Sequence, residues 1–167
     1  MDFRIDIDQS SDATLFALHD LGDILANIPG DRTAFQQIGN AIRAGIANNF
    51  DRERAGDLYP WADLAKSTQV ERQLLGFPAQ HPILHRTGEY RSSFTDANHP
   101  LHYAAFSIRA SGFEIEIGSA DPRAPILEYG DDELIPARAA AVLSRDAVDR
   151  LSDVLHELII AALEKGL

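Results

Sequence analysis

The sequence predicts one α+β domain over residues 1–167, and three observations predict it. Apolar side chains recur at helical spacing before residue 51, and again after residue 138. Between these regions, two strand-like runs flank a short turn that contains glycine. No linker or internal repeat divides the chain, and its length suits one hydrophobic core. We therefore expect an N-terminal strand and helical hairpin, a long irregular loop, an antiparallel β-hairpin sheet and a long C-terminal helix.

The N-terminal region is expected to hold the strand and two helices. Apolar and polar side chains alternate over residues 3–8, which predicts a half-buried strand. Ser10 or Ser11 can cap a helix that continues to the turn at Pro29-Gly30, and Asp31 can cap a second helix. The apolar sides are Leu15, Leu18, Leu21, Leu25 and Ile28 in the first helix, and Phe35, Ile38, Ile42, Ile46 and Phe50 in the second.

The next stretch, at about 51–86, loses this periodicity and predicts an irregular loop. It is interrupted by glycine and proline, at Gly56, Pro60, Gly76, Pro78 and Pro82. A long irregular segment inside a compact domain is usually functional or mobile. Within or after it, the sequence accommodates a short helix around Leu64–Leu74 and another over Thr87–Phe94, with Thr87 as its cap.

The remaining residues predict a β-hairpin and a helix. Leu101–Arg109 and Phe113–Gly118 surround Ala110-Ser111-Gly112, and the second run has one apolar and one acidic face. A short apolar piece, Ile126–Tyr129, then ends at Gly130. One long helix is expected from about Arg138 to Lys165, with an apolar stripe formed by Val148, Leu151, Leu155, Leu158 and Ala162.

Composition narrows the function classes. The chain has no cysteine, which excludes disulfides, thiol nucleophiles and thiolate metal sites. The net charge is −11, with six acids against one base in residues 1–30 and twelve against six in residues 101–167. DNA-binding proteins need a clustered basic surface, so we expect no sequence-specific nucleic acid binding. The first residues do not resemble a secretory signal and no apolar run is long enough for a membrane span, which favours a cytoplasmic protein.

Some residue clusters suggest a metal site or a catalytic site, but an ordinary surface or loop explains each of them. His81, His85 and Glu89 are spaced like metal ligands on a helix, but Pro82 and Gly88 oppose a continuous helix there. The carboxylates of residues 6 and 8, and those of residues 131–133, suit solvated surfaces. The sequence contains no nucleophile elbow, phosphate-binding loop or dinucleotide fingerprint. We expect neither a metal site nor a cofactor, and we expect that the protein is not an enzyme.

A series of landmarks between Trp61 and Arg138 carries a family resemblance. The first landmark is a spaced series of tryptophan, leucine, threonine and arginine. A threonine-glycine pair and an arginine-x-serine motif follow. The last landmarks are two segments that end in glycine and an Ile-Pro-Ala-Arg motif. The matching residues, which are also the candidate interface residues, are Trp61, Leu64, Thr68, Arg72, Thr87, Gly88, Arg91, Ser93, Gly118, Gly130, Pro136 and Arg138. In this order they resemble the phage virion-morphogenesis family, which contains the Mu-like tail-completion proteins. Ala139-Ala140 replaces the proline and aromatic residue that this family usually has there.

The same residues can be interpreted physically. Trp61 is the only tryptophan, and it either anchors the irregular loop to the domain or belongs to a satellite of the core. Gly88 and Gly130 suit turns that a Cβ would oppose. Pro136 suits the entry to the last helix, and Arg138 either pairs with an acidic neighbour or anchors an interface.

The resemblance implies a structural protein of the phage particle that completes the tail or joins tail to head. Its expected partners are other tail or connector proteins and copies of itself in a closed ring, with the loop at 51–86 and the hairpin edge as candidate contacts. Its expected location is the virion, and the host cytoplasm during assembly. The alternative is a cytoplasmic oligomeric adaptor or regulatory protein that pairs through its C-terminal helix. A third hypothesis is a metal-dependent hydrolase that uses His81, His85 and acidic residues.

Overall fold

The computed structural model describes residues 33–78, 82–109, 112–131 and 134–164. The expected N-terminal strand, the first helix of the expected helical hairpin and the turn at Pro29-Gly30 lie outside these residues. Within them the chain is an α+β fold with a C-terminal helix, as the sequence predicts. None of the described helices is both long and apolar enough to cross a membrane.

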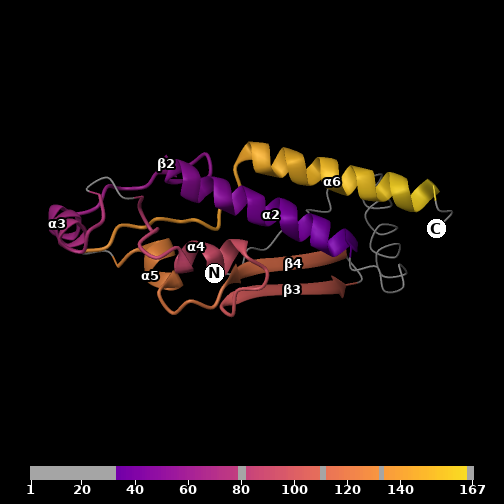
Figure 1. Ribbon diagram of the computed structural model, residues 1–167. Helices are drawn as coiled ribbons and strands as arrows, with labels where there is room; N and C mark the ends of the chain where they lie inside the picture. Colours follow the sequence, from indigo (N-terminus) through magenta and orange to yellow (C-terminus); the bar gives the residue numbers. More distant parts are fainter. Residues whose placement is uncertain (1–32, 79–81, 110–111, 132–133, 165–167) are drawn as a thin grey trace.

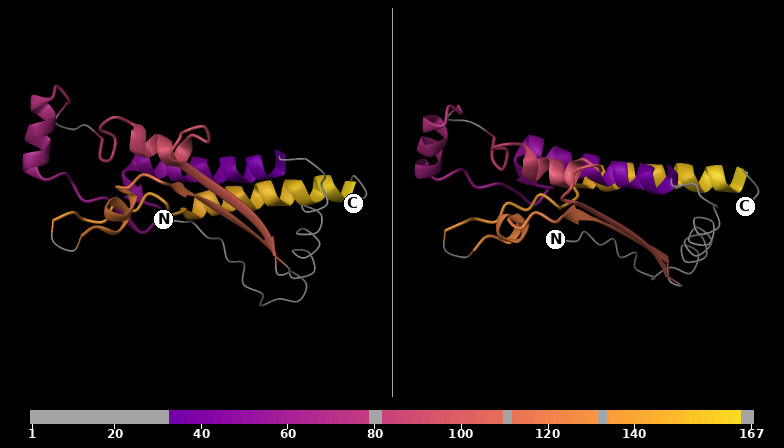
Figure 2. Two further views of the ribbon diagram at one scale, coloured as in Figure 1. Left: turned by 90° about the horizontal axis from the view of Figure 1, so that it is seen from below. Right: turned by 60° about the horizontal axis from the view of Figure 1, so that its bottom comes forward.

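Two antiparallel helices lie side by side along the molecule (Figures 1 and 2). They are α2 (Thr33–Arg52) and α6 (Arg145–Glu164). The predicted apolar side of α2 is confirmed, since Ile38, Ile42, Ile46 and Phe50 are buried. Gly45 permits the close approach of the helices, because a Cβ there would lie 2.8 Å from the Cβ of Ala147.

The predicted hairpin is confirmed as β3 (His102–Arg109) and β4 (Gly112–Ser119), which pair antiparallel. Ile115 and Ile117 are buried, as the alternation in the second strand predicts. The hairpin packs against α2 and α4, and its far end diverges from the long helices (Figure 2). Within the described part of the chain, the two strands form a two-stranded sheet of their own.

A short helix, α4 (Glu89–Thr95), completes the core. The prediction that Thr87 caps this helix is wrong: the cap is Gly88, whose φ of 80° is in the left-handed region that favours glycine. Tyr90 and Phe94 of α4 meet Phe50 and Trp61 in a cluster of aromatic rings. Edge-on contacts dominate this cluster, which is the arrangement that ring quadrupoles favour.

The segment at 51–86 contains short elements joined by irregular chain. Arg54–Ala55 (β1) pairs antiparallel with Tyr59–Pro60 (β2), a contact that the sequence did not predict. The short helix expected around residues 64–74 is α3 (Lys66–Leu74). Helix α3 stands at one end of the molecule, apart from the long helices (Figures 1 and 2).

The C-terminal helix begins later than predicted. After the short helix α5 (Ala124–Tyr129), residues 138–144 form a non-helical segment, here called the strap, and α6 starts only at Arg145. Pro136 is exposed and does not begin the helix. The predicted stripe is also partly wrong, because Val148 is 46% exposed while Ala147 and Leu151 are buried.

Candidate functional site

The strap crosses the core, and side chains from distant parts of the chain bind its main-chain groups. Asn49 of α2 donates from Nδ2 to the carbonyl oxygens of Ala140, at 2.8 Å, and of Val142. Trp61 donates from Nε1 to the carbonyl oxygen of Ala139 at 3.1 Å. Because buried main-chain groups need partners, these bonds allow a non-helical segment to lie in the core.

Glu128 is the buried acid that holds the strap from the other side. Glu128 is 2% exposed. Its carboxylate accepts hydrogen bonds from the main-chain nitrogens of Ala140, at 2.9 Å, and Ala141, at 3.2 Å. The Tyr90 hydroxyl donates to the same carboxylate at 2.9 Å. Burial raises the pKa of Glu128, and these hydrogen bonds partly offset that rise because they favour the charged form. Burial, followed by the charge of Glu128, raises the pKa of Tyr90 well above its ordinary value.

Arg138 fastens the start of the strap to the loop. It is 6% exposed and donates from Nε to the carbonyl oxygen of Ala62 at 3.0 Å, and from Nη2 to that of Asp63 at 3.2 Å. The expected pair with an acidic neighbour is therefore replaced by bonds to main-chain carbonyls. Burial, followed by the positive charge of Arg72, lowers the pKa of Arg138.

Trp61 belongs to the main core, and it anchors the irregular loop. It is 5% exposed, and the centroid of its ring lies 5.5 Å from the centroid of the Phe50 ring. Leu64 packs half-buried against the same core. Thr68 is half-buried on α3.

Other motif residues are distributed over the fold. Ser93 is fully buried and accepts a hydrogen bond from Ser119 at 2.7 Å, and Gly118 pairs with Tyr103 in the hairpin. Arg91 forms an ion pair with Asp51 at 2.8 Å.

Gly130 is required by its backbone conformation and its surroundings. It has a φ of 75°, and a Cβ there would lie 2.5 Å from the carbonyl oxygen of Ile135. The expectation that Gly88 and Gly130 occupy turns opposed to a Cβ is confirmed by their positive φ values.

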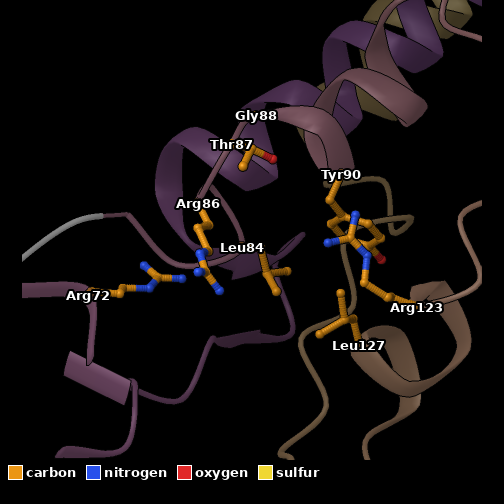
Figure 3. Close-up of a pocket in the computed structure, with 8 residues that line it drawn as sticks. All are labelled: Arg72, Leu84, Arg86, Thr87, Gly88, Tyr90, Arg123 and Leu127. Carbon is orange, nitrogen blue, oxygen red and sulfur yellow. The ribbon is translucent and has the colours of Figure 1, made fainter. Parts of the chain in front are cut away.

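A pocket of about 180 Å³ brings Arg72, Thr87 and Gly88 together (Figure 3). Arg72 and Arg86 lie beside each other on one side of the pocket, and Tyr90, Arg123 and Leu127 lie on the other. Its full lining is Arg72, Leu84, Arg86, Thr87, Gly88, Tyr90, Arg123 and Leu127. We call this site the arginine pocket.

The three arginines of the pocket differ in how firmly they are held. Arg72 is 8% exposed and donates to the carbonyl oxygen of Pro82 at 3.0 Å. Arg123 binds the buried carboxylate of Asp121 through both Nε and Nη2. Arg86 lies 3.8 Å from Glu71, and both side chains are more than half exposed, so this ion pair contributes little.

Burial and a neighbouring cation together disfavour the charged form of Arg72. Burial, followed by the positive charge of Arg86, lowers the pKa of Arg72, while Glu53 and Glu71 oppose that effect. The arrangement therefore offers guanidinium groups next to apolar side chains in a chain whose net charge is −11. Such a pocket can bind an oxyanion that carries an apolar stem.

The histidines give no cluster of metal ligands in the described part of the chain. There, no group of three or more His, Asp or Glu side chains is placed to hold an ion. His85 precedes α4, so it does not share a helix with Glu89. Glu89 instead contacts His99 at 2.9 Å. His81 lies outside the described residues.

Sequence reasoning missed the residues that complete the pocket and the buried network. Arg86 and Arg123 are separated by 37 positions, and only the fold brings both to one cavity. Glu128 and Asn49 carried a weak signal, because each is a polar residue inside an otherwise apolar pattern.

Comparisons with family models, with curated proteins and with solved structures give no match for this chain.

Proposed function

We propose that this chain is a structural subunit of a tailed-phage particle, which completes the tail or joins tail to head and has no catalytic role. The assignment to a phage particle rests on the ordered resemblance between Trp61 and Arg138. Most of those motif residues build the fold: Trp61, Ser93 and Arg138 are buried, and Gly88 and Gly130 form turns. A motif made of such residues suits a protein that binds others through its shape.

The observation that carries the binding role is the exposed apolar surface of α3. Val70 and Leu74 lie four residues apart on this helix, and are 54% and 84% exposed. Leu75, which follows directly, is 52% exposed. Apolar side chains that gather on a projecting element favour an interaction site. We call Val70, Leu74 and Leu75 the α3 face.

Two further features support contacts between subunits. Leu58 and Tyr59, at the turn between β1 and β2, are 70% and 39% exposed. They belong to the same segment of 51–86 in which the sequence predicts contacts. Within the described residues the β3–β4 hairpin pairs with no other strand, and such a two-stranded sheet can be extended by a strand of a neighbouring subunit. A head-to-tail arrangement of such contacts closes into a ring.

The alternative adaptor, which pairs through the C-terminal helix, is less well supported. The apolar stripe of α6 is already used within the chain, because Leu151 is buried and Leu155 and Leu158 pack against the core. A helix whose stripe is covered in this way has a reduced apolar surface for pairing.

Tailed particles purified from induced source cells would test the proposed function. We expect the chain to co-sediment with the particles, and gold-labelled antibody against it to bind at the head–tail junction. Recovery of all the chain in the soluble fraction, with unlabelled particles, would exclude the structural role. A capsid protein of the same particles serves as the control for recovery.

A further inference from the structure

We infer that the arginine pocket binds a carboxylate carried on a short aliphatic stem, as a Glu side chain of a partner protein presents it. The inference goes beyond the proposed function and stands on the pocket alone. Its basis is the placement of Arg72, Arg86 and Arg123 around one cavity together with Leu84 and Leu127 (Figure 3).

The size of the cavity selects a small ligand. Pockets that bind cofactors and other small molecules usually enclose about 300–1,000 Å³. The arginine pocket has only about 180 Å³, which is too small for a nucleotide and is of the order of one protein side chain. A single side chain of a partner is therefore the better match.

The charges select an isolated carboxylate over a polyanion. A guanidinium group matches the planar carboxylate and can bind it through two parallel hydrogen bonds. Nucleic acid would also meet the surrounding acids, which include Glu71, Asp121 and the rest of a chain with a net charge of −11. One carboxylate in the pocket would relieve the repulsion between Arg72 and Arg86 without bringing further negative charge close to those acids.

Arg86 is the residue best placed to receive the ligand. Its present partner, Glu71, lies at 3.8 Å in solvent, and an incoming carboxylate can replace such a weak contact. The apolar part of the ligand would contact Leu84 and Leu127. Leu84 has a φ of 58°, and non-glycine residues held in the left-handed region are concentrated at functional sites.

The test uses the full chain with arginine side chains labelled with ¹⁵N, titrated with butyrate, formate and phosphate at constant ionic strength. Butyrate carries its carboxylate on a short aliphatic stem, as a Glu side chain does. We expect butyrate to shift the Nε–H signals of Arg86 and Arg123 saturably, and to bind more tightly than formate or phosphate. Non-saturable shifts, or phosphate binding as tight as that of butyrate, would overturn the inference.

Two variants locate the site. Arg86→Gln removes an exposed guanidinium, and we expect it to weaken butyrate binding about tenfold, in line with the loss of one charge-assisted bond. Arg150→Gln removes an exposed arginine of α6 and should leave butyrate binding unchanged. Equal binding by Arg86→Gln and the wild type, with the ¹⁵N spectra showing both folded, would place the ligand elsewhere and contradict the inference.

Discussion

The main-chain nitrogen of Ala140 donates hydrogen bonds to both carboxylate oxygens of Glu128, at 3.0 and 2.9 Å. This contact joins α5 to the strap across twelve positions of the sequence, inside the core. Main-chain hydrogen bonds to α5 and α6 hold the two ends of the strap, at Arg138 and Ser144. Its middle depends on side chains, because buried main-chain groups need partners. Glu128 accepts a hydrogen bond from the main-chain nitrogen of Ala140, and Asn49 donates one to the carbonyl oxygen of the same residue.

Glu128→Gln should lower the free energy of unfolding by about 3 kcal/mol, since it breaks a buried network around a charge. Within the described residues, the carboxylate accepts hydrogen bonds from Tyr90, Ala140 and Ala141. An amide would point its own N–H groups at one of these donors. Urea unfolding measures the change, and Glu157→Gln, on the exposed side of α6, is the control. Equal losses in both variants would show that the network does not hold the strap.

Gly130→Ala and Gly76→Ala form a matched pair. Both glycines have positive φ, at 75° and 84°. A Cβ at Gly130 would meet the main chain of Ile135 at 2.5 Å, whereas a Cβ at Gly76 would have nothing within 4 Å. We expect Gly76→Ala to cost about 1 kcal/mol for strain, and Gly130→Ala at least twice as much because the main chain must also move. Thermal unfolding of both variants checks the order, and a greater loss at Gly76 would be evidence against this geometry.

Acid should weaken the fold in part through Asp121. The hydrogen bonds from Arg123 lower the pKa of Asp121 in the folded chain. A carboxylate with a lowered folded pKa stabilises the protein above its unfolded pKa of about 3.9, and this contribution is lost as the pH falls through the folded pKa. Asp121→Asn should therefore show a smaller loss of unfolding free energy between about pH 5 and pH 2 than the wild type. Asp149→Asn, at an exposed position of α6, should retain the wild-type pH dependence.

Local patterns were sufficient for α2 and for the β3–β4 hairpin. The periodicity from Phe35 to Phe50 identified α2, and the alternation at Phe113–Gly118 identified the second strand of the hairpin. The start of the C-terminal helix was wrong, since Ala139, Ala140 and Ala141 have high helix propensity and no local signal opposes a helix there. Asn49 and Trp61 donate hydrogen bonds to this segment, and Glu128 accepts hydrogen bonds from it. These three residues lie far away in the sequence or in another element.

The candidate site was predictable only in part, for a related reason. The motif identified Arg72, Thr87 and Gly88, which the fold does bring together at the pocket. Arg86 directly precedes Thr87 in the chain, whereas Arg123, at the start of α5, reaches the same cavity only through the fold. A single sequence carries no record of that proximity. The partners of Arg138 were not predictable either, because main-chain carbonyls leave no charge pattern in the sequence.

The central claim is that the chain assembles through the α3 face, and mass by light scattering over a concentration series tests it most directly. We expect the wild type to form a closed species larger than a dimer, with ring-shaped particles in negative stain. Leu74→Glu should shift the equilibrium to monomer, because it places a charge in an apolar contact, whereas Glu71→Gln on the same helix should not. A tight dimer with nothing larger, or a Leu74→Glu variant that assembles like the wild type, would contradict the claim.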